Sequence, residues 1–376
     1  MEEQSFMPCK ADAVSVSWIQ DDVALGEAVA SWESIIGIDT EFQRTDTFFP
    51  IPGLYQVLSG DRVYLLDPLT ISDWTPFLEV LEDPRLTKIM HACSEDLELM
   101  RHHFGAVPRG VFDTQLANAF QSADYSTSYA NLVAAQLGEQ LDKHETRSNW
   151  LRRPLSDEQL RYAWEDVHYL PDLHRILFAG LERLGREQWF AEVMADRGRY
   201  QPTDPDEYYR NLKTAWRLDG LQLGVLQRLC AWRERKAMAV DVPRNRVVWD
   251  EHLLEFAKTR RLAEDAIHDL LPRNVARRYA AELVQVHASA MQSAESLEPL
   301  ARPLTQSQSQ VSKGLRQVAR EQAESLQLAH ELLARKRDVE ACVRHYLVNG
   351  ELSPAYKGWR HAVVGAQFQA RLEGRD

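Results

Sequence analysis

The chain has 376 residues, of which 44% are hydrophobic and 27% are charged, as in folded globular proteins. This length exceeds one typical domain, so two or three domains are expected. No basic segment followed by an apolar one opens the chain, and no run reaches about 18 apolar residues. We therefore expect no signal peptide and no membrane-spanning helix, and a protein of the cytoplasm.

Four cysteines are spread along the chain without a CxxC pair, namely Cys9, Cys93, Cys230 and Cys342. Such spacing does not fit a zinc site or a dense disulfide framework. We expect free thiols in a reducing compartment.

The net charge of −12 is unevenly distributed. Residues 205–376 contain 27 Lys and Arg against 22 Asp and Glu, whereas residues 1–204 contain 17 against 34. An acidic front part that binds cations and a basic rear part that touches phosphates would explain this difference. Ordinary variation between two domain surfaces explains it equally simply.

The first 120 residues alternate between β-rich runs and helical segments. A helix is expected over 21–31, followed by a strand from Ile35 to Phe42 and a proline-containing loop. The runs 54–58 and 63–67 flank a glycine-containing turn and predict an antiparallel hairpin beside that strand. Further along, helices are expected over 74–81, 94–104 and 114–120, and strands over 86–91 and 110–113. This order predicts an α/β domain with a mixed sheet over residues 1–202.

A helix is predicted to start after Ser156, because Ser156 and Gln159 form a capping-box pattern. Pro171 should end it or start a new helix over 172–184. After a linker at 201–206, β-rich runs become rare. Two all-helical domains are expected over 207–289 and 311–372, joined by a Ser-, Gln- and Pro-rich linker over 290–310.

Two carboxylates, Asp39 and Glu41, stand two residues apart in the first predicted strand. They should point to the same face, where like charges repel unless a divalent cation lies between them. An acidic strand end in solvent is the alternative.

Two later segments offer further polar groups. Asp96 falls in the first turn of a predicted helix, where an acidic residue also serves the helix dipole. Tyr162 and Asp166 lie four residues apart and share one helix face, either as part of a site or as a surface contact.

Together these stretches resemble the DEDD exonucleases in their tyrosine variant, and specifically the ribonuclease D family. The matching stretches are Ile38–Phe42, His91–Asp96, Phe112–Gln115, Leu141–Trp150 and Tyr162–Val167. The two helical regions resemble tandem HRDC domains, the second more diverged. The resemblance covers nearly the whole chain.

The resemblance implies a ribonuclease H-like fold and hydrolysis of RNA from its 3′ end to 5′-mononucleotides, with a role in tRNA 3′-end maturation. It also implies two divalent ions, Mg²⁺ or Mn²⁺, which can activate water and stabilise a leaving oxyanion. Asp39, Glu41 and Asp166 would hold the first ion. Asp39 would bridge to the second, which Asp96 supports. Tyr162 would orient the attacking water, since a phenol with a pKa near 10 is a poor base.

Several neighbouring residues are candidate substrate contacts, with core packing or exposure to solvent as the alternative for all of them except His91. They are Phe42, Gln56, His91, Lys143, Arg147 and Ser148. Asp113 is predicted to cap the helix from Thr114.

The basic runs 233–236, 244–246 and 335–337 could hold an RNA backbone or could simply be solvated helix ends. RNA with a free 3′ end, such as a tRNA precursor, is the expected partner of a monomer. A DNA-directed exonuclease and a non-catalytic nucleic-acid binding module are the alternatives, and docking of protein partners on the helical domains stays open.

Overall fold

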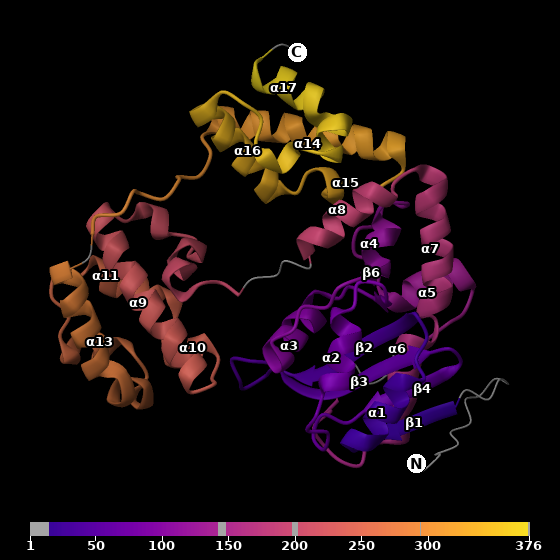
Figure 1. Cartoon of the computed structure of the whole chain (residues 1–376). Helices are drawn as coiled ribbons and strands as arrows, with labels where there is room; N and C mark the ends of the chain where they lie inside the picture. Colours follow the sequence, from indigo (N-terminus) through magenta and orange to yellow (C-terminus); the bar gives the residue numbers. More distant parts are fainter. Residues whose placement is uncertain (1–14, 142–147, 198–201, 294, 375–376) are drawn as a thin grey trace. The chain divides into compact units, whose positions relative to one another are not determined.

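A computed structural model describes residues 15–141, 148–197, 202–293 and 295–374 (Figure 1). These residues form two compact units. The first takes the described residues of Met1–Gln43, Pro52–Tyr200 and Leu304–Asp376, and the second takes Arg44–Ile51 and those of Gln201–Pro303. Within the described residues, no helix is long and apolar enough to cross a membrane.

The first unit is built on a six-stranded mixed sheet with the order β1-β4-β3-β2-β5-β6. The strands are β1 (Ser15–Ile19), β2 (Ile35–Gln43), β3 (Ile51–Ser59), β4 (Arg62–Leu66), β5 (Thr87–Met90) and β6 (Val111–Asp113). The predicted hairpin is confirmed, since β3 and β4 pair antiparallel around Gly60 with its φ of +59°. β2 and β5 pair in parallel, as do β5 and β6.

The edge strand β1 was not predicted. It pairs in parallel with β4, from Ser15 opposite Arg62 to Ile19 opposite Leu66. The alternating order of Ser15 to Trp18 is the strand signal that was overlooked.

Helices cover both faces of the sheet (Figure 1). One face packs against α1 (Asp22–Ala30), α2 (Thr75–Glu82) and α3 (Ser94–Phe104). The other carries α4 (Thr114–Ala119), α5 (Tyr129–Leu137), α6 (Asp157–His168), α7 (Leu170–Leu184) and α8 (Glu187–Arg197). The helices α5 and α8 were missed in the sequence. Pro171 lies in the first turn of α7, where a missing N–H costs nothing.

Successive side chains of the central strand β2 point alternately to the core and to the site. Ile36 and Ile38 are fully buried against α1–α3, so Asp39 and Glu41 face the side of α6 and α7. On that same side, a β-carbon at Gly37 would come within 3.2 Å of the Leu170 side chain. Glycine therefore lets α7 approach the strand closely.

The last helices of the chain share the core of this sheet domain. They are α14 (Gln306–Leu326), α15 (His330–Leu333), α16 (Lys336–Asn349) and α17 (Ala366–Leu372). Trp359 stacks on Trp189 with 5.0 Å between ring centroids and meets Phe120 at 5.5 Å. The N–H of Ala329 donates to the carbonyl of Ala119 at 2.8 Å. These helices thus complete the first unit.

The second unit is all-helical. Its helices are α9 (Gly220–Ala239), α10 (Arg244–Val247), α11 (Asp250–Lys258), α12 (Glu264–Leu270) and α13 (Arg273–Ser293), preceded by the 3₁₀ segments η1 (Pro205–Asn211) and η2 (Ala215–Arg217). The segment Arg44–Ile51 belongs to this unit. The N–H groups of Phe48 and Phe49 donate to the Asp241 carboxylate at 3.0 and 3.1 Å.

Both predicted linkers are shorter than expected. The first ends at Asp204, which caps η1, and Tyr209 of that segment is buried. The second was predicted over 290–310, yet α13 continues to Ser293 and α14 begins at Gln306. Thr305 and Gln308 form a capping box, so the Ser/Gln run is a helix start and its polarity reflects exposure.

Candidate active site

Three carboxylates from two elements meet in the first unit. Asp39 and Glu41 come from β2 and Asp166 from α6, and each offers an oxygen within 4.8 Å of the others. The three side chains are half-buried. Groups 125 residues apart in sequence are therefore brought together by the fold into one acidic cluster.

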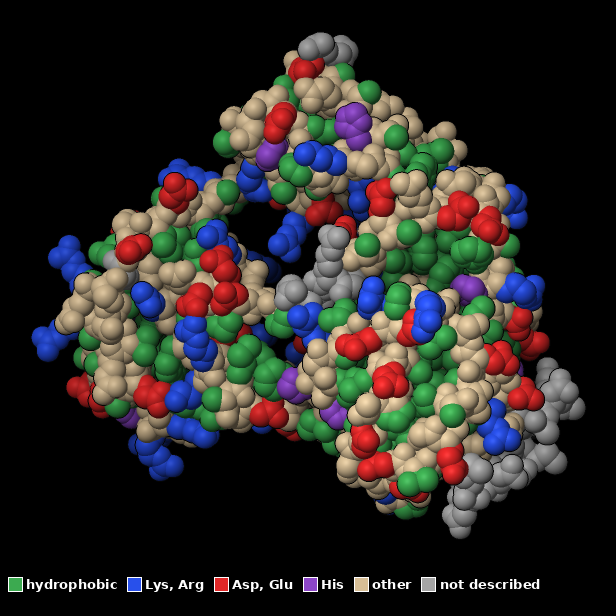
Figure 2. All heavy atoms as spheres, in the orientation of Figure 1, with side chains coloured by type: hydrophobic (Ala, Val, Ile, Leu, Met, Phe, Trp, Pro, Cys, Tyr) green, Lys and Arg blue, Asp and Glu red, His purple; other side chains and the backbone are tan. Residues whose placement is uncertain are grey.

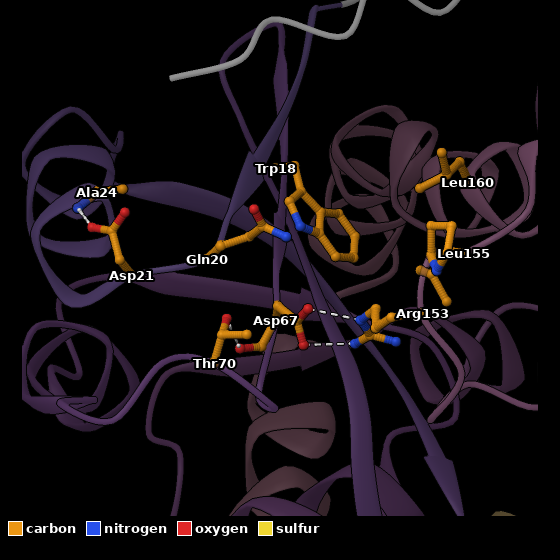
Figure 3. A pocket seen from close by; sticks show the side chains of 10 residues that line it. Trp18, Gln20, Asp21, Ala24, Asp67, Thr70, Arg153, Leu155 and Leu160 are labelled. Atoms are coloured by element: carbon orange, nitrogen blue, oxygen red, sulfur yellow. Dashed lines mark hydrogen bonds and ion pairs between the residues drawn. The ribbon is translucent and has the colours of Figure 1, made fainter.

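The start of α6 is fixed in two ways. The Ser156–Gln159 capping box is present, which confirms the prediction. Just before it, the guanidinium of Arg153 makes two hydrogen bonds of 2.6 and 2.7 Å to the buried Asp67 carboxylate (Figure 3). The same guanidinium donates to the carbonyl of Gly53. The Arg153–Asp67 pair lines a cavity of about 510 Å³ beside Trp18. It anchors the segment that leads into α6, and hence Asp166, to β3 and the end of β4.

Asp96 lies in the first turn of α3 and is only 8% exposed. Its carboxylate accepts a short hydrogen bond from the Thr40 hydroxyl, which lies between Asp39 and Glu41 on β2. Asp96 is not one of the three clustered carboxylates, but its negative charge contributes to raising the pKa of Asp39 and of Glu41. It therefore borders the site from the neighbouring helix.

Burial and mutual repulsion strongly perturb the acidic groups. Burial, followed by the charges of Asp166 and Asp96, raises the pKa of Glu41 to about 9. Burial also raises the pKa of Asp166 to about 8, despite an opposing hydrogen bond from Tyr162. The pKa of Asp39 is raised well above its ordinary value by the same two causes. Without a cation, this site retains protons at neutral pH.

The donor set fits a hard divalent cation. All the converging atoms are carboxylate oxygens, which Mg²⁺ and Mn²⁺ prefer. The buried Oδ2 atom of Asp166 has no hydrogen-bond partner among the described residues. A cation would supply both the missing partner and the missing positive charge.

Divalent cations should stabilise the protein more at high pH than at low pH. A folded-state pKa raised from about 4 to about 8 or 9 means that the folded chain binds more protons, so stability in EDTA falls as pH rises through this window. A cation replaces those protons. At a free concentration a hundredfold above its Kd it adds about 2.7 kcal/mol.

The measurement is the difference in melting temperature between Mg²⁺ and EDTA at pH 5, 7 and 9. We expect a difference of several degrees at pH 9 that shrinks toward pH 5. A difference independent of pH would contradict the protonated state of the metal-free site.

Comparison with known proteins identifies the family. A family model described as 3′-5′ exonuclease matches residues 16–182, and the HRDC domain model matches residues 222–286. Ribonuclease D of Pseudomonas paraeruginosa is 40% identical over 374 residues, covering 96% of this chain and 98% of that protein. The chain belongs to the ribonuclease D family. The predicted resemblance is thereby confirmed.

Solved structures agree with this ribonuclease D assignment. Escherichia coli RNase D, described as an exoribonuclease involved in structured RNA processing, superimposes with a TM-score of 0.88 at 31% identity, covering 96% of this chain and 99% of that one. The catalytic core of RRP6 from Trypanosoma brucei has the same fold, with a TM-score of 0.59 at 20% identity over 78% of this chain and 84% of that one. The predicted combination of a mixed-sheet exonuclease domain and a helical HRDC domain is confirmed.

Tyr162 stands beside the acidic site of this ribonuclease D family member. Its phenol is half-buried and hydrogen-bonded to Asp166, and burial followed by the charges of Asp166 and Glu41 raises its pKa far above the ordinary value. Trp150 packs near it, with 6.0 Å between ring centroids. A phenol that stays protonated can donate a hydrogen bond but cannot act as a base near neutral pH.

Tyr162→Phe should lower kcat by about tenfold to a hundredfold and leave the pH profile of the remaining activity unchanged in shape. The hydroxyl is lost, but the packing of the ring against Trp150 is kept. Single-turnover rates from pH 6 to 9 check this expectation. A lost basic limb in the profile would show instead that the phenol titrates during turnover.

Two of the predicted substrate contacts also have partners within the protein. His91 has both ring nitrogens bonded within the protein, one to the Thr114 hydroxyl at 2.9 Å and one to the Thr127 carbonyl at 3.1 Å. Phe42 packs against the core on the face opposite Glu41. Phe42 therefore has the packing role that was its alternative, and contacts of either residue with substrate stay predictions.

Gln56 is fully buried, which excludes the alternative that it faces solvent, and its contact with substrate stays a prediction. Its side-chain amide has no hydrogen-bond partner among the described residues. Ser148 accepts a hydrogen bond from Gln159 at 2.8 Å and so supports the start of α6. Lys143 and Arg147 lie outside the described residues.

Two contributors to the site were missed. Thr40 orients Asp96, and its position between two carboxylates on a strand, facing the other side, was the available signal. Tyr129 of α5 donates its hydroxyl to the Glu165 carbonyl at 3.2 Å, and its own pKa is raised by burial and then by the charge of Asp166. No local pattern marks Tyr129, because its contact with α6 exists only in the fold.

The basic run 233–236 is not a free cationic surface. Arg233 is 1% exposed and pairs with Asp250 and Glu234 inside the helical unit. Arg235 and Lys236 form ion pairs with Asp206 and Glu282. Neither alternative for this run, an RNA contact or a solvated helix end, therefore fits Arg233, which is a core residue of this domain.

Proposed function

We propose that this protein is a 3′-to-5′ exoribonuclease that releases 5′-mononucleotides from RNA. The observation that carries the proposal is the convergence of Asp39, Glu41 and Asp166, with Asp96 beside them, in a chain of the ribonuclease D family. Three clustered carboxylates with a fourth beside them cost stability unless they serve a bound cation.

Two divalent ions, Mg²⁺ or Mn²⁺, are the proposed cofactors. Asp39, Glu41 and Asp166 would hold the first, and Asp39 with Asp96 the second. Bound there, such ions supply positive charge that lowers the pKa of the attacking water and stabilises the charge on the phosphate. The carboxylates are suited to this task because their own charges favour cation binding.

The protein's own groups position the reactants. Tyr162 keeps its proton and can donate a hydrogen bond that orients the water near Asp166. Thr40 holds the Asp96 carboxylate, and the Arg153–Asp67 pair anchors the segment before α6. Positioning of this kind can supply a large part of the rate enhancement.

RNA with a free 3′ end, such as a tRNA precursor, is the proposed substrate, and the first HRDC domain (207–289) is the proposed auxiliary grip. Figure 2 shows Lys and Arg side chains projecting from the body formed by α9–α13. A groove of about 900 Å³ in this unit contains Trp249, which is 52% exposed, together with Lys213. An exposed indole near a cation suits a stacked base and its phosphate. Residues 311–372 are the proposed diverged second HRDC domain.

Trp249→Ala should weaken binding of single-stranded RNA by about 1–3 kcal/mol, because one stacked base is lost. Fluorescence anisotropy with a labelled RNA and EDTA checks this. Trp216→Ala, which removes another indole of the same unit outside this groove, is the control. Equal loss in both variants would mean that Trp249 has no specific contact with RNA.

We further propose that the protein is a cytoplasmic monomer. The described cysteines Cys93, Cys230 and Cys342 are buried free thiols, as a reducing compartment allows. Light scattering of the purified chain tests the monomer.

The decisive experiment compares 3′-labelled RNA, 5′-labelled RNA and matched DNA with Mg²⁺, Mn²⁺ or EDTA. The proposal expects stepwise release of 5′-mononucleotides from the RNA 3′ end, and none in EDTA. Internal cuts, a preference for DNA, or no hydrolysis would overturn it.

A further inference from the structure

The helix that carries Asp96 begins at an unusual turn. Ala92 has a φ of +53°, a left-handed conformation that non-glycine residues rarely adopt. Cys93 is the N-cap of α3, yet its side chain makes no capping hydrogen bond. Another group must therefore hold this turn and satisfy its backbone N–H groups.

That group is Asp113, at the end of β6. Its carboxylate accepts the N–H of Ala92 at 3.2 Å and the N–H of Cys93 at 3.3 Å. It also accepts the N–H of Leu116 at 3.1 Å, which confirms its predicted role as the cap of α4. One fully buried carboxylate thus organises the starts of two helices.

A buried carboxylate needs a counter-ion, and Arg197 provides it. This last residue of α8 makes a short ion pair with Asp113, and its guanidinium is mostly buried. It also contacts the Tyr125 hydroxyl at 3.4 Å. Arg335, at the start of α16, donates to the same hydroxyl and lies 4.9 Å from the Tyr125 ring centre. The contacts run without a gap from the last helices to the Asp96 turn.

We propose that Asp113 is a positioning residue for Asp96, acting through the Ala92–Cys93 turn and held by Arg197. Asp96 lies three residues after Cys93, within the first turn of α3, where the N–H of Leu97 donates to the Cys93 carbonyl at 3.0 Å. Any shift of Cys93 therefore moves the Asp96 carboxylate. Thr40 holds this carboxylate directly, and Asp113 holds the backbone behind it.

This inference rests on the proposed two-ion site, in which Asp96 supports the second ion. Residues behind a metal ligand typically change metal affinity by 10- to 100-fold when replaced. A role in fold stability alone would lower the melting temperature without distinguishing one ion from the other. Separate affinities for the two ions therefore decide between the two roles.

The test is calorimetric titration of the full chain with Mn²⁺ alone, with melting temperatures measured in EDTA. Asp113→Asn should weaken the second ion at least tenfold and the first less than twofold. Arg197→Gln should weaken the second ion in the same way but less, and Arg197→Lys should recover most of the loss. If Asp113→Asn fails to fold, the two Arg197 variants decide.

Glu234→Gln is the matched control. Glu234 is also a buried carboxylate held by arginine, with Arg244 at 3.0 Å, but it lies in the second unit. The Glu234→Gln variant should have a lower melting temperature than the wild type but should bind both ions with wild-type affinity. Equal weakening of both ions by Asp113→Asn or Arg197→Gln, or wild-type affinity in each of them, would overturn the inference. Wild-type protein without Mn²⁺-dependent hydrolysis would instead refute the proposed function, and this inference with it.

Discussion

Replacing Asp166 with asparagine should lower kcat at least about a thousandfold and at the same time stabilise the metal-free protein. The first effect follows because the proposed first ion loses one of its three carboxylates. The second follows from the raised pKa of about 8. Above pH 4 the aspartate of the unfolded chain ionises freely. In the folded chain the same group either keeps its proton or is repelled by the neighbouring carboxylates. Asparagine removes that penalty.

The check combines single-turnover hydrolysis of RNA in Mg²⁺ with melting temperatures in EDTA at pH 8. Asp39→Ala should also abolish turnover, since Asp39 is the proposed ligand of both ions. Asp172→Asn is the control, because Asp172 is exposed on α7 and pairs only at the surface with Arg175. Near-normal Mg²⁺-dependent hydrolysis by either site variant would show that the site is wrongly assigned.

The Asp166→Asn substitution would therefore raise the stability of the metal-free protein while it lowers activity. Such opposition is expected where like charges are gathered for function and the fold must tolerate them. It also separates a catalytic carboxylate from a structural one such as Asp67. Asp67→Asn would lose its ion pair with Arg153 and should lower stability.

Local patterns predicted much of this protein correctly. Alternation placed Asp39 and Glu41 on one face of β2, and a helical repeat placed Tyr162 one turn before Asp166. Caps carried further information, since Ser156 and Asp113 were both predicted to start helices and both do so. In each case the residues that determine the local structure lie within a few positions of the residues that they place.

Errors arose where distant groups decide the structure. Arg233 belongs to a charged run that looks solvated, and only its partners Asp250 and Glu234 explain its burial. The chain around Gln306 was interpreted as a linker because composition cannot distinguish an exposed helix start from a loop. Likewise, no local pattern shows that α14–α17 would share a core with α4, α7 and α8.

That shared core predicts a large effect of truncation. Deleting residues 304–376 should prevent stable folding of the exonuclease domain, although the acidic site lies outside the deleted segment. The deletion would expose Phe120 and Trp189, which pack on Trp359. It would also leave the buried Arg186 guanidinium, which donates to the carbonyls of Phe120 and Leu326, without its second acceptor. A deletion from residue 205 onward would have the same defect, so it could not isolate an RNA-binding role of the helical domains.

A milder version of the same test is Trp359→Ala in the full chain. Trp359 is 4% exposed, and its loss should cost about 3–5 kcal/mol of unfolding free energy in the first unit. Trp249→Ala removes an equally large but exposed side chain and should cost less than about 0.5 kcal/mol. Urea unfolding of both variants gives the comparison.

A chain ending at residue 303 that melts at the full-length temperature would show that the last helices are an appended domain. A cooperative loss of the sheet domain would show that they are part of its core.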